Sequence, residues 1–484
     1  MSSLVAVINR NGEDALETAA TMLETLKTDK TETFGIASSS KAIIKNDLQA
    51  VLKAKIKSAL LVGYLFSKIL DTDKPQLLKL EGGTIAFDGR IYSSKNFADA
   101  LATTTTPNHD NKRKLADLLK KTDGDFVLVL VEPERILACR SPIGCRPLYQ
   151  GQNATYVALA SERKALWKIG IKETCSFPPG HITITDKHGF KSTPIKTLKY
   201  AKSKQMIMKT AARKLQTLLE DSVRKRVSGL KEVAVAFSGG LDSSIIAYLA
   251  KKSNIDVQLI HVSLRNQPET EYAKKAAEEL KLPINIHIYE EEDLETVVPK
   301  VLWRIEEPDP VKTSIGIPLY WAAENAARKD FRVLLAGQGA DEMFGGYKRY
   351  VDEYLQHGDA AAQRQMFEDI TKIHENNIER DFKICTCHSV ELRLPFATYK
   401  IAKFAVSLPI ELKLERSQNT LRKLVLRNAA KNLGIPENIV EKHKKAIQYT
   451  TGVSRVLEKI CKKKKITLKE YLQMAFQNAT KRMA

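Results

Sequence analysis

Residues 237–244, with the sequence Phe-Ser-Gly-Gly-Leu-Asp-Ser-Ser, are the stretch that most constrains how this 484-residue chain can fold. The preceding run, residues 232–237, is short, apolar and partly β-branched, which predicts a buried strand. Residues 245–252 have helical spacing and a basic end, which predicts a helix. The sequence therefore predicts a loop at a strand-to-helix turn, where an α/β fold binds ligands beside the carboxyl end of a strand.

The residue types in this loop suit a polyphosphate ligand. Gly239 and Gly240 let the backbone approach a phosphate closely, and the hydroxyl groups of Ser238, Ser243 and Ser244 can donate hydrogen bonds to it. The start of the following helix also favours an anion. A glycine turn with a serine cap would explain a lone Gly-Gly pair, but seven specified residues in this setting favour a nucleotide site.

Asp242 is the exceptional member of the loop, because a carboxylate beside a polyphosphate repels it unless a divalent cation lies between them. We therefore predict that Asp242 is a Mg²⁺ ligand and that the cofactors are ATP and Mg²⁺.

Length and composition favour a globular protein of two domains, with 43% hydrophobic residues. No apolar run reaches about 18 residues, and the first residues lack a signal-peptide pattern, so we expect a cytoplasmic protein without a membrane partner. The six cysteines are too few and scattered for a disulfide framework. The net charge of +20 suits nucleic acid, but it suits anionic small molecules equally, so a nucleic-acid partner is left open and not favoured.

Two domains are expected along the chain. Residues 1–190 are rich in short apolar strands between turn residues and predict a mainly β domain. Residues 191–205 are polar and lysine-rich, which suits a linker, and residues 206–484 open with a helical pattern. Strands and helices then alternate, which predicts a parallel sheet covered by helices, at residues 257–262, 271–280, 284–289, 294 onward and 332–336.

The run 237–244 resembles the ATP-pyrophosphatase loop of the asparagine synthetase family, whose members adenylate a carboxylate and release pyrophosphate. It lacks the lysine of the G-x-x-x-x-G-K-[ST] loop, which implies cleavage between the α and β phosphates. The resemblance covers roughly residues 205–455. Four further segments are similar to family signatures: 266–273 with 306–309, 337–347, 388–396 and 442–452.

The resemblance implies the site residues. Those assigned to ATP are Ser238, Gly239, Gly240, Leu241, Asp242, Ser243, Ser244, Val262, Gly337 and Gly339. Asp242 and Asp341 are the implied metal ligands, although Asp341 and Glu342 could instead cap the helix there. The catalytic candidates are Lys444, which by resemblance faces the acyl-adenylate, its neighbour Lys445, and Gln338. Outside this set, Glu391 and Arg393 are left open between a catalytic role and a structural ion pair.

Three departures from the family concern the acceptor. Gln338 stands where synthetases often carry Glu, and a neutral amide cannot take a proton from ammonium as a carboxylate can. Val311, Lys312 and Ser314 stand at the positions aligned with aspartate-binding Thr-Thr and Arg. Ala397-Thr398 replaces the usual Leu-Asp. The resemblance therefore supports adenylation more firmly than it supports any one acceptor.

Residues 1–190 resemble the glutaminase domain of the same enzymes, an N-terminal-nucleophile (Ntn) hydrolase. The similar segments, in the family's order, are 123–126, 140–149, 160–162 and 177–180. The expected fold class is thus α/β overall. It combines an Ntn-hydrolase-like α+β sandwich with a doubly wound, parallel-sheet ATP-pyrophosphatase domain that has a helical C-terminal part.

The glutaminase chemistry is expected to be lost. Ser2 stands in place of the nucleophilic cysteine, and Asp88-Gly89 replaces the oxyanion-hole Asn-Gly, placing a negative charge where an oxyanion would form. The glutamine-binding Arg-Gly-Pro-Asp segment is missing around residues 32–36. We therefore predict a structural or regulatory remnant and an ammonia-dependent enzyme.

The favoured hypothesis is an ATP- and Mg²⁺-dependent amide ligase that adenylates a carboxylate, aspartate by resemblance, and aminates it with free ammonia. Two alternatives stay open. One is an RNA-modifying enzyme that adenylates a base, which the basic charge favours and the lack of a CxxC pair opposes. The other is a non-catalytic protein that retains ATP binding as a scaffold. Whether the chain forms a homodimer is a separate question that the sequence leaves open.

Overall fold

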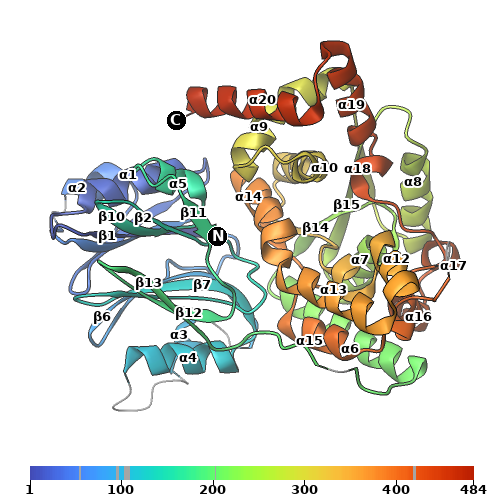
Figure 1. Cartoon of the computed structure of the whole chain (residues 1–484), viewed down its shortest axis with the longest axis horizontal. Helices are drawn as coiled ribbons and strands as arrows, with labels where there is room; N and C mark the ends of the chain where they lie inside the picture. The colour runs from blue at the N-terminus through green and yellow to red at the C-terminus, as the bar shows by residue number, and fades with distance from the viewer. Residues whose placement is uncertain (54–55, 94–96, 103–109, 202, 418–420, 484) are drawn as a thin grey trace. The chain divides into compact units, whose positions relative to one another are not determined.

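The computed structural model describes residues 1–53, 56–93, 97–102, 110–201, 203–417 and 421–483. The chain forms two compact units, Met1–Thr197 and Leu198–Ala484 (Figure 1). The functional domain limits inferred from the sequence, 1–190 and 206–484 with a linker between them, stay predictions.

The first unit contains two antiparallel sheets. The seven-stranded sheet has the order β11 (Thr174–Ser176), β9 (Tyr149–Gln152), β10 (Tyr156–Ala160), β1 (Ser2–Asn9), β4 (Leu60–Phe66), β2 (Thr33–Ala37), β3 (Ala42–Lys45). The six-stranded sheet has the order β13 (Gly189–Pro194), β12 (His181–Asp186), β8 (Ile136–Arg140), β7 (Gly124–Val131), β6 (Gly83–Ile91), β5 (Leu77–Leu80).

Alternation along the strands explains the layering of this unit. In β1, Leu4 and Ala6 join a core that also holds Val127 and Val129 of β7, so this core lies between the two sheets. Val5 of β1 faces the other way, toward a helical layer. That layer contains α1 (Leu16–Leu26), α2 (Leu48–Lys53) and α5 (Arg163–Trp167). The six-stranded sheet carries α3 (Phe97–Ala102) and α4 (Asn111–Lys121) on its outer face (Figure 1). The unit is the expected Ntn-hydrolase-like sandwich.

The second unit is built on a five-stranded parallel sheet. Its order is β16 (Ile284–Tyr289), β15 (Asp256–Leu264), β14 (Glu232–Ala236), β17 (Val333–Leu335), β18 (Glu391–Arg393). In chain order, the strands are added outward on one side of β14, first β15 and then β16, and the next strands, β17 and β18, are added on its other side. Ligands bind beside such a switch point in open α/β sheets.

Helices connect these strands and extend the unit toward the C-terminus. Those before β17 are α6 (Met208–Val227), α7 (Leu241–Lys252), α8 (Pro268–Leu280), α9 (Glu291–Ile305) and α10 (Pro310–Arg328). Those after it are α11 (Ala340–Phe344), α12 (Lys348–His357), α13 (Asp359–Thr371), a π-helical turn (His374–Ile378), α14 (Glu379–Cys387), α15 (Tyr399–Ser407), a 3-10 turn (Ile410–Leu412), α16 (Leu424–Leu433), α17 (Glu437–Val440), α18 (Ile447–Thr450), α19 (Val453–Lys464) and α20 (Leu468–Met483). In the described part of the chain, no helix is both long and apolar enough to cross a membrane.

The predicted loop is shorter than the sequence suggested. Helix α7 begins at Leu241 and not at residue 245, because Gly240 has an extended conformation (φ −78°, ψ 168°) and serves as its N-cap. Asp242, Ser243 and Ser244 therefore lie in the first turn of the helix. The backbone N–H groups of Asp242 and Ser243 have no partner within the helix, whereas that of Ser244 donates to the carbonyl of Gly240 at 3.1 Å.

Candidate functional site

A cavity of about 690 Å³ lies at the carboxyl ends of β14, β15 and β17 in the second unit. Most of the predicted site residues line it: Ser238, Gly240, Leu241, Asp242, Ser243, Val262, Gly337, Gln338, Gly339, Asp341, Lys444 and Lys445. The structure thus brings together residues that are up to about two hundred positions apart in the sequence.

Two predicted site residues do not line this cavity. Gly239 (φ +69°) faces α8, where an added Cβ would lie 2.9 Å from Cα of Ala273. Ser244 is fully buried inside the first turn of α7. Both residues shape the loop, and the assignment of the Ser244 hydroxyl to ATP is not supported by its position.

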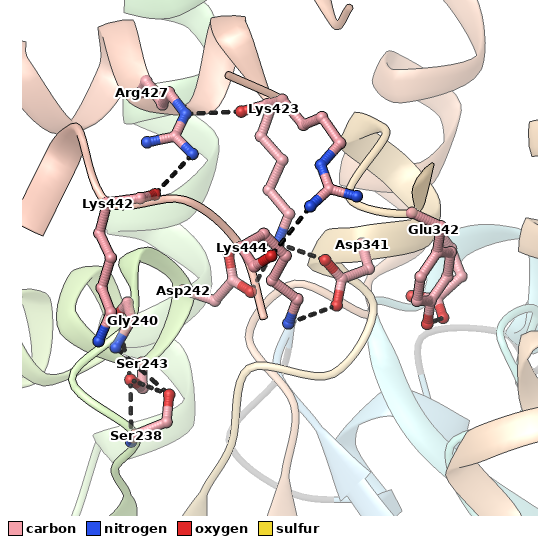
Figure 2. A network of polar contacts seen from close by, with 12 residues as sticks. Ser238, Gly240, Asp242, Ser243, Asp341, Glu342, Lys423, Arg427, Lys442 and Lys444 are labelled. Carbon is pink, nitrogen blue, oxygen red and sulfur yellow. Dashed lines mark hydrogen bonds and ion pairs between the residues drawn. The ribbon is translucent and has the colours of Figure 1, made fainter. Parts of the chain in front are cut away.

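The loop is folded by its own hydrogen bonds (Figure 2). The hydroxyl groups of Ser238 and Ser243 lie 3.3 Å apart, and the backbone N–H of Ser238 donates to Oγ of Ser243 at 3.4 Å. The backbone N–H of Gly240 donates to Oγ of Ser238, and Oγ of Ser243 donates to the carbonyl of Gly240. These bonds hold the donors in place before any ligand arrives, at the positive end of α7.

Two carboxylates and two ammonium groups meet beside the loop (Figure 2). Nζ of Lys423 lies 2.7 and 2.6 Å from the two oxygens of Asp242 and 2.7 Å from Oδ1 of Asp341. Nζ of Lys444 lies 2.9 Å from Oδ2 of Asp341. We call Asp242, Asp341, Lys423 and Lys444 the charge cluster.

The charge cluster fixes the ionisation of its members. Burial alone would raise the pKa of Asp341, but the ammonium groups of Lys423 and Lys444 outweigh it and lower that pKa well below its usual range. Burial alone would lower the pKa of Lys444, but the carboxylates of Asp341 and Asp242 raise it above its usual range. Lys444 is therefore a permanent cation, as electrostatic stabilisation of a negatively charged transition state requires.

Lys445 and Lys442 lie close by but outside the charge cluster. Nζ of Lys445 binds Glu269 at 2.8 Å, and 62% of its side chain is exposed. Lys442 lies over the ring of Tyr272 and points toward the loop, and burial lowers its pKa to about 8 (Figure 2). The choice of Lys444 over Lys445 therefore agrees with the geometry.

Lys423, Arg422 and Arg427 were missed by the sequence reasoning. Arg427 donates to the backbone carbonyls of Arg422, Val440 and Lys442, and Arg422 donates to the carbonyl of Lys444 at 2.9 Å. These bonds hold the segment that carries Lys444. One local signal pointed to them: Arg422 and Lys423 stand directly before α16, where positive charge is unfavourable next to the helix dipole. Basic residues at such a position indicate a tertiary contact that stabilises them.

Gly346 explains the second glycine pair of the signature 337–347. An added Cβ at Gly346 would lie 1.7 Å from Oδ1 of Asp341 and 2.5 Å from Cε of Lys423. Only glycine leaves room for this ion pair at its observed position.

The donors suit a shared Mg²⁺ site. In the described part of the chain no three His, Cys, Asp or Glu side chains are grouped as metal ligands. Asp242 and Asp341 nevertheless supply two carboxylates around one point, the position of the Lys423 ammonium. Mg²⁺ is commonly held by one or two carboxylates together with substrate phosphates, so the residues fit that mode of binding.

A buried guanidinium lines another part of the cavity. Nε of Arg380 binds Asp381 at 2.7 Å, whereas Nη1 has no hydrogen-bond acceptor among the described residues. Burial raises the pKa of Asp381, and the Arg380 guanidinium opposes this rise. Gln338 lines the same cavity.

The three positions aligned with aspartate-binding residues offer little polar contact. Val311 is apolar and 60% exposed. Nζ of Lys312 binds Glu307 at 2.8 Å, and Oγ of Ser314 donates to the carbonyl of Val311. Each polar group here already has a partner.

The remaining acidic candidates have structural partners. Oε1 of Glu342 accepts hydrogen bonds from Tyr347 and Asn377, and no side chain caps α11, so neither Asp341 nor Glu342 has the alternative capping role. Glu391 and Arg393 form a buried ion pair at 2.6 Å away from the cavity lining, which supports their structural interpretation.

In the first unit, the hydroxyl group of Ser2 is hydrogen-bonded to Tyr64. Oγ of Ser2 lies 2.9 Å from the hydroxyl of Tyr64, which also accepts a hydrogen bond from the backbone of Gln76. Burial raises the pKa of Tyr64 well above its usual range, so this phenol cannot serve as a base. Asp88 is buried beside Arg146 at 3.5 Å.

A parallel sheet with a switch point, a glycine-serine loop and this cavity define a nucleotide-binding α/β protein. The asparagine synthase family model matches residues 214–361 and 352–480, and a glutamine amidotransferase domain model matches residues 69–168. The chain therefore belongs to the asparagine synthetase family, which performs ATP-dependent amide ligation.

Individual relatives agree with this membership. A putative glutamine-hydrolysing asparagine synthetase 1 of Methanocaldococcus jannaschii is 28% identical over 534 aligned residues, covering 98% of both chains. The asparagine synthetase of Gallus gallus is 24% identical, covering 77% of this chain and 72% of its own.

Solved structures match more weakly. A glutamine phosphoribosylpyrophosphate amidotransferase from B. subtilis aligns with a TM-score of 0.35 at 15% identity, over 59% of this chain and 65% of its own. An NMN synthetase from Francisella tularensis aligns with a TM-score of 0.28 at 14% identity, over 58% and 97%. With TM-scores this low, neither structure is used to assign a fold or a function to this chain.

We predict that Gly346→Ala will leave the protein folded but lower ATP-dependent pyrophosphate release by roughly 10²-fold, because the new methyl group displaces Asp341 and Lys423. Gly358→Ala is the control outside the site: nothing lies within 4 Å of its added Cβ, but its φ of +82° disfavours alanine, so it should lower thermal stability and leave pyrophosphate release unchanged. Thermal unfolding and pyrophosphate release are measured for both variants, and full activity of Gly346→Ala would contradict the assigned role of this contact.

Proposed function

We propose that this protein is an ATP- and Mg²⁺-dependent ligase that activates a carboxylic acid as its acyl-adenylate and converts it to an amide with free ammonia. The observation that carries the proposal is the charge cluster beside the loop 238–243, at the switch point of the parallel sheet. It combines anion donors, a permanent cation and two candidate metal ligands around one cavity.

The chemistry has two steps. First, a carboxylate oxygen of the acceptor attacks the α-phosphorus, the bond to the bridging oxygen of the β-phosphate breaks, and pyrophosphate leaves with the electron pair. Ammonia then attacks the acyl carbon, loses a proton, and AMP leaves. Bound Mg²⁺ would neutralise phosphate charge during the first step.

The loop and Lys444 have separate roles in this proposal. Ser238, Ser243 and the first turn of α7 bind the phosphates, because their donors face the cavity. Lys444 stabilises the negative charge that develops around the α-phosphorus and on the departing pyrophosphate. Arg422 holds the backbone of Lys444 in place.

Arg380 is the proposed anchor for the acceptor. Its Nη1 is a buried donor at the cavity wall that has no acceptor in the described chain, and a carboxylate would satisfy it. Aspartate is the acceptor that the family resemblance implies and is the reference substrate for experiments. Because Val311, Lys312 and Ser314 offer no free polar group, aspartate would need other contacts.

Free ammonia is the proposed nitrogen source. The contact of Ser2 with Tyr64 and the buried position of Asp88 leave the first unit without an evident nucleophile and base. Neither the RNA-modifying nor the scaffold alternative is favoured by a feature of the site. A cytoplasmic location and a homodimer stay predictions.

Pyrophosphate release tests the proposal directly. The purified protein should release pyrophosphate from Mg·ATP only with a carboxylic acid, and amide should form when ammonium is added. Lys444→Ala should lower this rate by about 10²–10³-fold while changing the affinity for an ATP analogue far less. Lys445→Ala is the matched control and should change the rate by less than about 3-fold, because the Lys445 ammonium group pairs with Glu269 and is exposed to solvent. An equal loss in both variants would remove Lys444 from the proposed mechanism.

Glutamine should not serve as nitrogen donor. Losing one oxyanion-hole donor costs roughly 10²–10³ in rate, and here the nucleophile and the glutamine-binding segment differ as well. Glutamate release from glutamine should equal that of a Ser2→Ala control, with or without ATP and aspartate. Release that depends on Ser2 would show that the first unit is a working glutaminase.

Arg380→Lys should raise the KM for the acceptor by about 10–100-fold, because it keeps the charge beside Asp381 but loses the free Nη1 donor. The affinity for ATP should stay unchanged. Arg349→Lys is the matched control, since the Arg349 guanidinium at the same cavity is already bound to Asp369. An unchanged acceptor KM in Arg380→Lys would place the acceptor elsewhere.

A further inference from the structure

The ammonium group of Lys423 occupies the point between the two candidate metal ligands. Three carboxylate oxygens lie within 2.7 Å of Nζ, two from Asp242 and one from Asp341 (Figure 2). Those are the same oxygens that a divalent cation would need. Lysine and metal therefore compete for one position.

The fold holds Lys423 there at a cost. Its backbone has φ +62°, an uncommon conformation for a residue with a side chain, and it stands at the N-cap of α16, where a cation is disfavoured. Its side chain is 2% exposed, and Gly346 leaves space for its Cε. Local preferences would not produce this placement, so the contact with the carboxylates must stabilise it.

Charge balance distinguishes a bare metal ion from a metal–nucleotide complex. The charge cluster is neutral, because the two carboxylates match the ammonium groups of Lys423 and Lys444. A bare divalent cation would leave an excess positive charge in a mostly buried site, which is costly. Mg·ATP brings negative charge along with the metal, and its phosphates can accept the displaced ammonium group.

We propose that Lys423 is a tethered cation that keeps divalent metal out of the site until a nucleotide delivers it. In the free protein its ammonium group fills the metal position. When Mg·ATP binds, Lys423 leaves Asp242 and Asp341 for phosphate oxygens, and the carboxylates pass to the metal. The exclusion of bare metal needs no catalysis, whereas the transfer step rests on the proposed nucleotide site.

Binding of Mn²⁺ alone, followed by electron paramagnetic resonance, tests the exclusion. The full-length wild type should bind Mn²⁺ weakly without nucleotide and take up one ion when α,β-methylene ATP is added. Lys423→Met should bind one Mn²⁺ without nucleotide, at least about 10-fold more tightly than the wild type, because the competing charge is gone. Asp242→Asn in the Lys423→Met background should abolish this gain.

Lys444→Met is the matched control, because it removes the same charge from the same carboxylate, Asp341, but leaves Lys423 between the ligands. It should gain no Mn²⁺ site. The proposal is overturned if Lys423→Met shows no gain, if Lys444→Met gains as much, or if the wild type already binds Mn²⁺ alone as tightly as Lys423→Met. Pyrophosphate release by the wild type reports separately on the proposed function.

A second measurement needs no variant and covers the case in which Lys423→Met does not fold. In wild-type protein labelled with ¹⁵N at lysine Nζ, the buried ammonium signal should persist with Mg²⁺ alone and shift on adding Mg·α,β-methylene ATP. A shift of that signal with Mg²⁺ alone would overturn the proposal. The other buried lysines, Lys164, Lys383 and Lys413, lie outside the charge cluster, so their slowly exchanging signals should stay in place in both steps.

Discussion

The site depends on the pairing of opposite charges, buried at Lys423 and partly buried at its partners, at the meeting point of four chain segments. Lys423 joins Asp242, 181 residues before it, to Asp341, and Lys444 completes the neutral cluster. An unpaired charge at this depth would cost several kcal/mol, so each member requires the others. The starts of α7, α11 and α16 and the segment that carries Lys444 are thereby held around one cavity.

Other features of the second unit follow from this requirement. Gly346 has no side chain because Asp341 and Lys423 occupy the space beside it. Arg422 and Arg427 bind backbone carbonyls of residues 440–444, which brings Lys444 to the carboxylates. The apparent excess of basic residues near the cavity thus has two parts, one that balances carboxylates and one that fastens a segment of backbone.

The two units use their polar residues differently. In the first unit, Ser2 and Tyr64 satisfy one another, and Asp88 lies beside Arg146, so these candidate groups are paired within the sandwich. In the second unit, the serine hydroxyls and the helix start face a cavity, and Nη1 of Arg380 has no acceptor in the described chain. Groups that stay available to a ligand are therefore found where the family keeps its ligase chemistry.

The sequence by itself determined the parallel α/β unit and the loop after β14, because strand, turn and helix preferences there are local and agree with one another. The choice of Lys444 came from the resemblance of residues 442–452 to a family signature and stays a prediction. It placed the start of α7 four residues late, since the capping conformation of Gly240 is not visible in apolar spacing. Only the tertiary structure identified Lys423 and buried Ser244 away from the cavity. The physical reason is that such roles arise from contacts between distant segments, where burial and charge pairing override local preference.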